Sequence, residues 1–543
     1  MAPAMGGVEV VDLIDSDSSD GDCVVVPAAP AAKRARTGDG GGAGGSAGRP
    51  PPAAAGDGIP RSAVRAQPVR MLTSSHVRCA APDERVGLAD VVEGDFEWAI
   101  VCDYLIDPAF LLRELPALGR CGRVCVFTDS RNSPRSTLGP ALACAPAFEL
   151  YYPPLPLQYG THHSKLFVLV FDKGVRVVVH TSNLIYSDVR DMAQGLWTQD
   201  FPLKTLDQLG ETSPFEDALV AYFEATKWPG TTVNGDRASV GVLRRFSFVN
   251  ATAMFVASVP GRHTGASLKK WGHLAVREAL RRDGGGGGDK DDLLALQYSS
   301  CGSMAPDKKT GDSQWLADEL ATSLCGGGAP VRDVRLVWPT VEEIRTSYAG
   351  YSSGNSVPGP SKNVLKPHLR ARYHRLTRDG DDAGKRLLTP HIKTFVRMQS
   401  RAANSVAPLI RFYLLTSSNL SKAAWGQLQL KGTQLQVLSY EAGVLVTPTT
   451  LSNASAAAEF SCTPKAWRCS LEGSPSGGSD TPTRVVMLPL RGGAAPAGEF
   501  AIARLPVPYE LPLEPYTTKD VPWVWDQGLF SGPPDRYGRF GHA

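Results

Sequence analysis

Short apolar runs rich in Val, Ile and Phe alternate with longer amphipathic stretches from about residue 67 onward. Such runs, bounded by turn-forming residues, are typical of β-strands. The clearest of them predict strands at residues 97–104, 123–127, 148–152, 253–259 and 409–415. Residues 165–171 and 175–180 flank Asp172-Lys173-Gly174, and this arrangement predicts a hairpin.

Two amphipathic stretches predict helices. In residues 267–282 the apolar side chains recur at helical spacing, at Trp271, Leu274, Ala275, Ala279 and Leu280. This stretch runs into the glycine cluster at 284–288, which indicates a flexible surface insertion. Residues 313–324 begin with a serine and are followed by glycine, as a helix often is. The alternation of strands and helices predicts an α/β protein.

The first 67 residues differ from the rest of the chain. They are rich in Ala, Gly, Pro, Ser and Asp, a composition that buries too little apolar surface to offset the entropy of ordering, so residues 1–67 are predicted to be a disordered tail. An aliphatic segment that starts at Val8 runs into acids and serines. From Val10 to Asp20 it resembles a SUMO-interacting motif, which would add a strand to the partner's sheet. The cluster Lys33-Arg34-Ala35-Arg36 is a candidate nuclear-import signal.

Composition narrows the class of protein. The chain has 543 residues, and 57 Lys and Arg against 54 Asp and Glu give a net charge of +3. This balance excludes a polycationic tail protein and a strongly acidic solvating protein. Because the chain has no apolar run of spanning length and starts without a secretory-type signal, we expect an intracellular protein that engages no membrane. The 10 cysteines lack CxxC spacing, which predicts reduced thiols rather than a zinc site.

The most informative feature is a weak internal repeat. Each copy contains His-x-Lys, then a β-rich segment, then Thr, one or two Ser, Asn and Leu. The first copy is His163-Ser164-Lys165 with Thr181-Ser182-Asn183-Leu184, and the second is His391-Ile392-Lys393 with Thr416-Ser417-Ser418-Asn419-Leu420. A single His-x-Lys motif is a common surface pattern, but two copies in the same order are a specific signal.

These residue types suit phosphoryl transfer. On a strand, His and Lys two residues apart point to the same face, so two copies that meet at a seam would gather two imidazoles and two ammonium groups. A neutral imidazole can attack phosphorus, and a protonated one can donate to the leaving oxygen. Lysines and asparagine amides can stabilise the charge that builds on the non-bridging oxygens. The lysines would supply the positive charge that a metal otherwise brings, and the sequence shows no carboxylate cluster suited to one, so no metal or other cofactor is predicted.

With these motifs the chain resembles the tyrosyl-DNA phosphodiesterases, a branch of the phospholipase D superfamily that removes topoisomerase I remnants from DNA 3′ ends. The likeness runs from about residue 68 to 543 and includes Ser258-Val259-Pro260-Gly261-Arg262, Lys270-Trp271-Gly272-His273 and the segments 390–397, 416–426 and 519–525. The wider superfamily usually carries Asp seven residues after its His. Here Val170 and Met398 occupy those positions, which is typical of the tyrosyl-DNA branch.

The resemblance implies two similar α/β/α sandwich domains of phospholipase D type, related by a pseudo-dyad, at residues 68–250 and 251–543. It implies a monomeric DNA repair hydrolase that needs no metal. The substrate would be DNA with a 3′-linked tyrosine, a topoisomerase I peptide or another 3′ adduct, at a single-stranded end or a nick. The product would be 3′-phosphate DNA, and the expected location is the nucleus.

The resemblance also implies a role for each residue of the two motifs. His163 is the expected nucleophile, which forms a phosphohistidine, and His391 is the expected proton donor and later acceptor. Glu441 would orient His163, and Gln194 would orient His391. Four further side chains would hold the phosphoryl group, namely Lys165, Asn183, Lys393 and Asn419.

Five more residues are implied in DNA or peptide binding: Tyr159, Ser300, Ser303, Ser421 and Trp525. Tyr159 occupies a position that is usually Phe in the family and would stack on a base. Ser421 would cap a short helix whose free N–H groups face phosphate. For Tyr159 and Trp525 the alternative is a packed structural aromatic. The basic stretch from Lys366 to Arg386 is either a DNA-binding stripe or a solvated helix face.

Two rival functions stay open from the sequence. Another phosphodiesterase of the superfamily, such as a lipase or nuclease, would share both motifs, but the residues at positions 170 and 398 argue against it. A catalytically silent nuclear adaptor would bind SUMO through the segment from Val10 to Asp20. It would show no turnover although His163 and His391 are intact.

Overall fold

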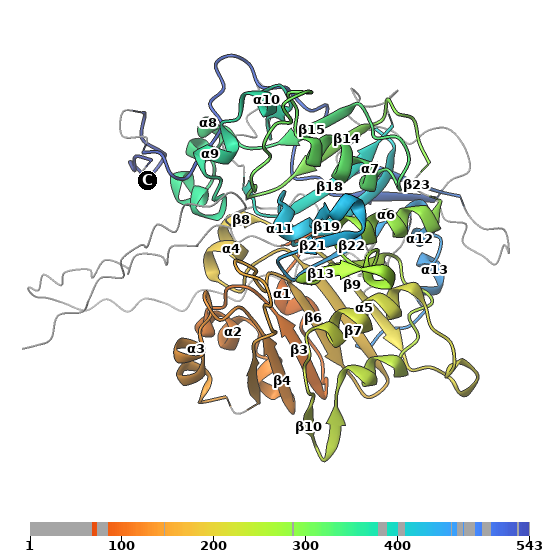
Figure 1. Ribbon diagram of the computed structural model, residues 1–543. Helices are drawn as coiled ribbons and strands as arrows, with labels where there is room; N and C mark the ends of the chain where they lie inside the picture. The colour runs from red at the N-terminus through yellow and green to blue at the C-terminus, as the bar shows by residue number, and fades with distance from the viewer. Residues whose placement is uncertain are drawn as a thin grey trace, which may run out of the picture.

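The computed structural model describes residues 68–72, 85–145, 147–284, 287–377, 388–399, 408–457, 459–463, 471, 484–490, 501–528 and 532–541. The predicted tail, with its SUMO-interacting motif and its basic cluster, lies outside these residues. The described chain is built on two mixed β-sheets with helices packed against them (Figure 1).

The first sheet contains eight of the described strands, in the order β2-β1-β9-β7-β6-β3-β4-β5. They come from the amino-terminal part of the chain, at the lower end of the molecule in Figure 1. Their bounds are β1 Arg70–Leu72, β2 Arg85–Val86, β3 Trp98–Cys102, β4 Arg123–Phe127, β5 Phe148–Tyr151, β6 Leu166–Val170, β7 Gly174–His180 and β9 Gly195–Pro202.

The second sheet contains nine of the described strands, in the order β12-β22-β19-β18-β14-β15-β16, with β23 paired to β19 and to β24. Their bounds are β12 Met254–Ser258, β14 Leu293–Gln297, β15 Asp333–Val337, β16 Tyr373–His374, β18 Lys393–Met398, β19 Ile410–Thr416, β22 Glu441–Val446, β23 Val485–Pro489 and β24 Ala501–Leu505.

The two sheets correspond strand by strand. The series β1-β9-β7-β6-β3-β4-β5 in the first matches β12-β22-β19-β18-β14-β15-β16 in the second. In the first series four antiparallel pairings are followed by two parallel ones. The second series has the same succession. The short repeat in the sequence therefore marks a repeat of a whole sheet.

Side-chain alternation explains how the layers form. On β3, Ile100 belongs to one apolar cluster, whereas its neighbours Ala99 and Val101 belong to another. Successive residues of a strand point to opposite faces, so each sheet carries two apolar faces. The cluster of Ile100 also contains Val396 of β18 and Val444 of β22, which shows that the inner faces of the two sheets share one core.

Helices cover the faces of the sheets. The cluster on the outer face of the first sheet includes α2 (Pro108–Glu114) and α3 (Arg135–Leu142). The outer face of the second is covered by α6 (Gly272–Asp283) and α7 (Ala321–Leu324), while α5 (Pro214–Ala225) packs into the shared core. The remaining described helices are α1 Leu88–Val91, α4 Tyr186–Asp191, α8 Val341–Thr346, α9 Ser361–Val364, α10 Pro367–Arg370, α11 Lys422–Trp425, α12 Pro448–Leu451 and α13 Ala454–Ala457.

The predicted α/β fold with two similar halves is confirmed, and two helices differ in detail. The helix predicted at 267–282 begins at Gly272, because residues Gly265–Ser267 form a separate 3₁₀ turn and Trp271 is extended. The helix predicted at 313–324 has the wider π-type winding over Trp315–Leu320. The domain boundaries at 67/68 and 250/251 stay predictions.

Candidate active site

Main-chain hydrogen bonds hold the first His-x-Lys segment against the second half of the chain. The N–H of His163 donates to the carbonyl oxygen of Tyr440 at 2.9 Å, and the N–H of Tyr440 donates to Thr161 at 2.8 Å. Gly160 makes this approach possible, since a Cβ at this position would lie 2.1 Å from the carbonyl oxygen of Leu438. The residue after Tyr440 is Glu441, so the pairing sets Glu441 beside His163.

The second His-x-Lys segment is held in the same way by the first half. The short strand β17 (Thr389–Pro390) pairs with β8 (Met192–Ala193). The N–H groups of His391 and Ile392 then donate to the carbonyl oxygen of Ala193, at 3.0 and 2.9 Å. Since Gln194 follows Ala193, this pairing sets Gln194 beside His391. Each half therefore supplies the partner of the other half's histidine.

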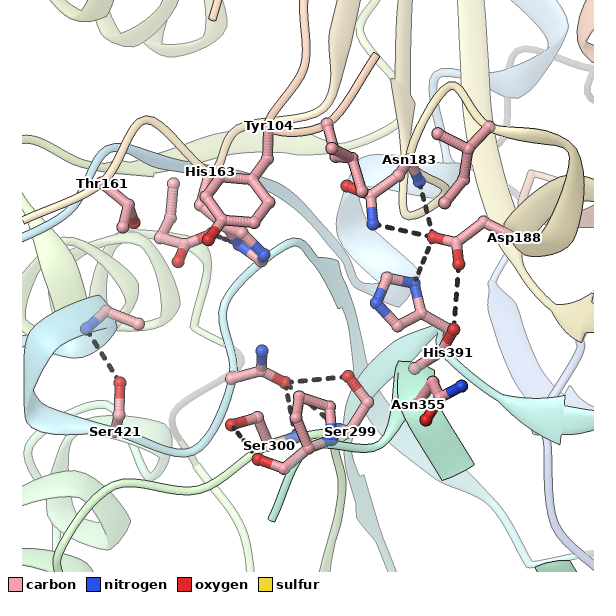
Figure 2. A pocket seen from close by; sticks show the side chains of 17 residues that line it. Tyr104, Thr161, His163, Asn183, Asp188, Ser299, Ser300, Asn355, His391 and Ser421 are labelled. Atoms are coloured by element: carbon pink, nitrogen blue, oxygen red, sulfur yellow. Dashed lines mark hydrogen bonds and ion pairs between the residues drawn. The ribbon is translucent and has the colours of Figure 1, made fainter. Parts of the chain in front are cut away.

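The two half-sites meet at a cavity of about 80 Å³. Figure 2 shows His163 beside Tyr104 on one side of this cavity and His391 beside Asp188 on the other. Both halves of the chain contribute polar side chains to its lining, namely Thr161, His163, Asn183, Asp188, Ser299, Ser300, Asn355, Ser356, His391, Asn419, Ser421 and Glu441.

His163 is oriented by a carboxylate. Its Nδ1 lies 2.9 Å from Oε2 of Glu441, and the hydroxyl of Ser417 donates to the same oxygen. Burial raises the pKa of Glu441, but the interactions with His163 and Ser417 outweigh it and leave that pKa below its ordinary value. Burial lowers the pKa of His163. With an acceptor at Nδ1, the neutral ring carries its proton there and keeps a lone pair on Nε2.

His391 has two partners at Nδ1. The amide Nε2 of Gln194 lies 3.0 Å away, and Oδ2 of Asp188 lies 3.3 Å away. Burial lowers the pKa of His391 well below its usual value, and the positive charges of Lys393 and Lys165 lower it further. The free ring is therefore neutral at physiological pH, and a bound anion would favour its protonated form.

Both lysines of the repeat are fully buried beneath the histidines. Nζ of Lys165 donates to the carbonyl of His163 at 3.2 Å, and Nζ of Lys393 donates to that of His391 at 2.6 Å. Burial lowers the pKa of both lysines, and for Lys393 the nearby charge of Lys165 adds to the effect. In each half the His-x-Lys segment lies at the start of its strand rather than inside it, before or at the first residue of β6 and β18.

The two asparagines of the repeat are held differently. Oδ1 of Asn419 accepts from the N–H groups of Ser299 and Ser300, at 3.2 and 3.0 Å, so its amide nitrogen is the group left to serve a ligand. Nδ2 of Asn183 donates to Oδ2 of Asp188 at 2.8 Å. One further hydrogen remains on that nitrogen. Hairpin pairing of β6 with β7 and of β18 with β19 returns both asparagines to the level of the histidines.

The sequence interpretation missed three residues at this site. Asp188 contacts both Asn183 and His391. The ring of Tyr104 packs edge-on against His163, with centroids 5.0 Å apart, and Nζ of Lys165 lies 5.6 Å from its centroid. Asp103 is fully buried, and burial raises its pKa to about 7. Asp103 and Tyr104 are the last two residues of the strand predicted at 97–104 and directly follow β3 in the structure, whereas Asp188 resembles an ordinary acid in the first turn of a helix.

The residues predicted to bind DNA or peptide divide into two groups. Ser300 and Ser421 line the cavity, and Oγ of Ser421 accepts from the N–H of Ala424 at 3.1 Å, which makes it the cap of α11 as predicted. Tyr159, Ser303 and Trp525 do not line the cavity. Tyr159 is 38% exposed and has a left-handed backbone with φ of 65°. Trp525 is half-buried.

Three arginines of the locally basic stretch are held by contacts within the described residues. Arg370 donates to the carbonyls of Thr517 and Asp520, Arg372 pairs with Asp312, and Arg375 pairs with Glu514 at 3.0 Å. These contacts tie residues 370–375 to the carboxyl-terminal segment and to the loop between β14 and the π-type helix at Trp315–Leu320. They fit a structural role better than a free DNA-binding stripe. Arg378, Lys385 and Arg386 lie outside the described residues.

The described ranges contain neither a metal-type cluster of side chains nor a membrane-spanning helix. No group of three or more His, Cys, Asp or Glu side chains there is arranged to hold a metal ion. None of the helices in the same ranges combines the length and the apolar character needed to cross a bilayer.

Comparison with known proteins gives one consistent family. The model of the tyrosyl-DNA phosphodiesterase family matches residues 72–517. Tyrosyl-DNA phosphodiesterase 1 of Arabidopsis thaliana is 37% identical over 471 residues, which cover 84% of this chain and 73% of that protein. The Drosophila melanogaster protein of the same name is 25% identical over 80% of this chain and 68% of its own length.

The fold comparison agrees with the sequence comparison. The crystal structure of yeast tyrosyl-DNA phosphodiesterase superposes with a TM-score of 0.59 at 16% identity, over 84% of this chain and 99% of the yeast chain. This likeness shows the phospholipase D-like fold. The chain thus belongs to the tyrosyl-DNA phosphodiesterase family and is a phosphodiesterase enzyme.

Proposed function

We propose that the chain hydrolyses the bond between a DNA 3′-phosphate and a tyrosine of topoisomerase I, or another 3′ adduct, and leaves 3′-phosphate DNA. The observation that carries the proposal is the pair of imidazoles at one cavity. The Nδ1 atoms of His163 and His391 are occupied by Glu441 and by Gln194 with Asp188. Each ring therefore has only Nε2 to offer a substrate.

The proposed reaction has two steps. In the first, Nε2 of His163 attacks phosphorus, the bond from phosphorus to the tyrosyl oxygen breaks, and the His391 imidazolium gives that oxygen its Nε2 proton. In the second, neutral His391 takes a proton from water while the water oxygen bonds to phosphorus and the phosphorus–nitrogen bond breaks. His163 returns to its neutral form, and the DNA leaves with a 3′-phosphate.

The proposal assigns the stabilising charge to the protein alone. Lys165 and Lys393 lie beneath the two imidazoles and would act as ammonium groups, and the amides of Asn183 and Asn419 would donate to the non-bridging oxygens. On this basis we propose that the reaction is independent of metal ions. Ser300, Ser303 and Ser421 would contact phosphates of the DNA, with Tyr159 stacked on a base and Trp525 toward the peptide.

The amino-terminal tail would contribute to localisation and to the binding of partner proteins. We propose a nuclear enzyme, active as a monomer, in which the segment from Val10 to Asp20 binds SUMO or a SUMO-modified protein. The support is the residue pattern alone. A peptide of this segment and a variant with its aliphatic residues changed to Ser would be titrated against SUMO, and equal absence of binding by both would refute this assignment.

The catalytic proposal is tested with an oligonucleotide that carries a 3′-phosphotyrosine, in excess EDTA. Wild type should release tyrosine and 3′-phosphate DNA, and His163→Ala should be inactive. His391→Ala should be slow and should accumulate DNA bound covalently to His163, detectable by denaturing gel and by mass spectrometry. A folded wild type that leaves this substrate intact, with or without added Mg²⁺, would refute the proposed substrate.

A further inference from the structure

The orientation of the Gln194 amide is fixed by its neighbours. The Thr181 hydroxyl accepts from the N–H of Gly195 at 3.0 Å and donates to Oε1 of Gln194 at 2.8 Å. The NH₂ group of Gln194 then faces Nδ1 of His391 at 3.0 Å and the carbonyl of Asp188 at 3.4 Å. An NH₂ group only donates. Gln194 therefore suits a His391 ring that carries no proton on Nδ1.

Both proposed steps need the other tautomer of His391. As proton donor the ring is an imidazolium, with protons on Nδ1 and Nε2. As the base that follows, it must have a bare Nε2, so its single proton is on Nδ1. In both states the Nδ1 proton needs an acceptor, which Gln194 cannot provide. Oδ2 of Asp188 lies within ion-pair distance of Nδ1, at 3.3 Å, and is a carboxylate oxygen placed to accept this proton.

We propose that Asp188 is a positioning residue that accepts a hydrogen bond from Nδ1 of His391 and so selects the tautomer able to give and take a proton at Nε2. The inference rests on the proposed function. It makes the two half-sites alike, because each histidine then faces a buried carboxylate that also accepts from a serine hydroxyl. The hydroxyl of Ser417 donates to Glu441, and the hydroxyl of Ser356 donates to Oδ1 of Asp188 at 3.1 Å.

The surroundings of Asp188 fit this role. Its side chain is almost completely buried, and Oδ2 accepts from the N–H and the Nδ2 of Asn183, at 3.0 and 2.8 Å. Burial raises its pKa above the ordinary value, and the hydrogen bond from the backbone N–H of Asn183 and the charges of Lys393 and Lys165 reduce that rise without cancelling it. Ser356 comes from the 3₁₀ segment Gly350–Ser356 of the second half, so Asp188 is held from both halves.

The proposed cycle moves protons only at Nε2 of His391. In the first step the Nε2 proton of His391 passes to the tyrosyl oxygen. The ring, now neutral, keeps its proton on Nδ1, where it is hydrogen-bonded to Asp188. In the second step Nε2 takes the proton of the attacking water, which restores the imidazolium as the bond from phosphorus to His163 breaks. Asp188 gains no proton, so its contribution is orientation and stabilisation of the imidazolium.

The test uses DNA with a 3′-(4-nitrophenyl) phosphate beside the 3′-phosphotyrosine substrate. Nitrophenolate leaves without a proton, so loss of the acid spares the first step, whereas the second step still needs the base. Asp188→Ala should give a burst of about one nitrophenolate per enzyme, then turnover slowed about 10- to 100-fold. The covalent adduct on His163 should accumulate. On the phosphotyrosine substrate both steps should slow.

The controls separate this role from a structural one. Asp191→Ala changes a carboxylate on the same helix α4 that pairs with Arg190 at 2.8 Å, and it should behave as wild type. Asp188→Asn keeps an acceptor oxygen without charge, so its turnover should lie between that of wild type and that of Asp188→Ala. It serves as a second variant if Asp188→Ala is unstable in thermal unfolding.

Two results would overturn the inference. One is an equal loss of activity on both substrates in folded Asp188→Ala or Asp188→Asn, with no accumulation of the covalent adduct on His163. The other is adduct accumulation by Gln194→Ala while both Asp188 variants turn over as wild type, because Gln194 would then be the acceptor. A normal burst by His163→Ala would instead refute the proposed phosphohistidine, and the role of Asp188 would fall with it.

Discussion

The backbone N–H of His391 donates to the carbonyl oxygen of Ala193 at 3.0 Å, and Ala193 is the residue before Gln194. The equivalent bond in the other half joins His163 to Tyr440, the residue before Glu441. Each catalytic candidate is thus aligned by main-chain pairing between the halves, and its side-chain partner follows from the register. Neither half contains a complete site alone.

Glu441→Gln should slow formation of the covalent intermediate by about 10- to 100-fold. The amide can donate to Nδ1 and so favour the tautomer of His163 whose Nε2 carries the proton and cannot attack. The burst of nitrophenolate should slow as much as tyrosine release, unlike the effect of Asp188→Ala. An unchanged burst rate in rapid-mixing experiments would contradict the role of Glu441.

Lys165→Ala should lower kcat by about 100- to 1000-fold, because the lost charge stabilises the transition state. The matched control is Lys173→Ala, which changes an exposed lysine in the turn that joins β6 to β7. Steady-state kinetics on the phosphotyrosine oligonucleotide would show the effect. A loss confined to KM would mean that Lys165 serves binding of the ground state instead.

Gly160→Ala should lower both stability and activity. The new methyl group would lie 2.1 Å from the carbonyl oxygen of Leu438, so the segment before His163 must move away from the second half. Such overpacking costs about 1–3 kcal/mol. Gly119→Ala is the control, since nothing lies within 4 Å of its Cβ position. Denaturant unfolding would measure the stability of both variants, and steady-state kinetics would measure their kcat. Equal stability and equal kcat in the two variants would contradict the prediction.

His180 should make the fold sensitive to acid. It is fully buried and stacked on Phe167, and burial lowers its pKa to about 3. Between that value and the ordinary pKa of about 6.5, the unfolded chain binds a proton that the folded chain does not, so stability falls as pH falls, by up to about 1.4 kcal/mol per unit. His180→Phe should remove this contribution. Denaturant unfolding of both proteins at pH 7.5 and pH 5 should show a smaller loss for the variant, and parallel losses would contradict the assignment.

Tyr159→Ala should weaken binding of single-stranded DNA, since a base stacked on an aromatic ring contributes about 1–3 kcal/mol. Tyr159→Phe keeps the ring and should bind as wild type. Fluorescence anisotropy with a labelled oligonucleotide that ends in 3′-phosphate would compare the three proteins. Equal affinity for all three proteins would show that Tyr159 does not bind DNA and has only a structural role in the turn before Gly160.

The local features of this protein can be read from its amino-acid sequence alone. Apolar runs located strands such as β4, which the prediction and the structure bound at the same residues. The two His-x-Lys motifs identified His163, Lys165, His391 and Lys393, because their spacing relative to the following strands is a property of the chain alone. Comparison of the two copies also revealed the internal repeat, which the strand order of both sheets bears out.

Which distant residues meet depends on how the folded chain packs. Asp188 lies on a short helix of the first half and reaches His391 across the interface, a contact that no local spacing encodes. Arg370 and Arg375 form a basic pattern in the sequence, yet in the fold Arg370 donates to the backbone carbonyl of Asp520 and Arg375 pairs with the carboxylate of Glu514. Local patterns follow from backbone geometry, whereas partners separated by hundreds of residues follow from how the two sheets pack, and a single sequence records that packing only indirectly.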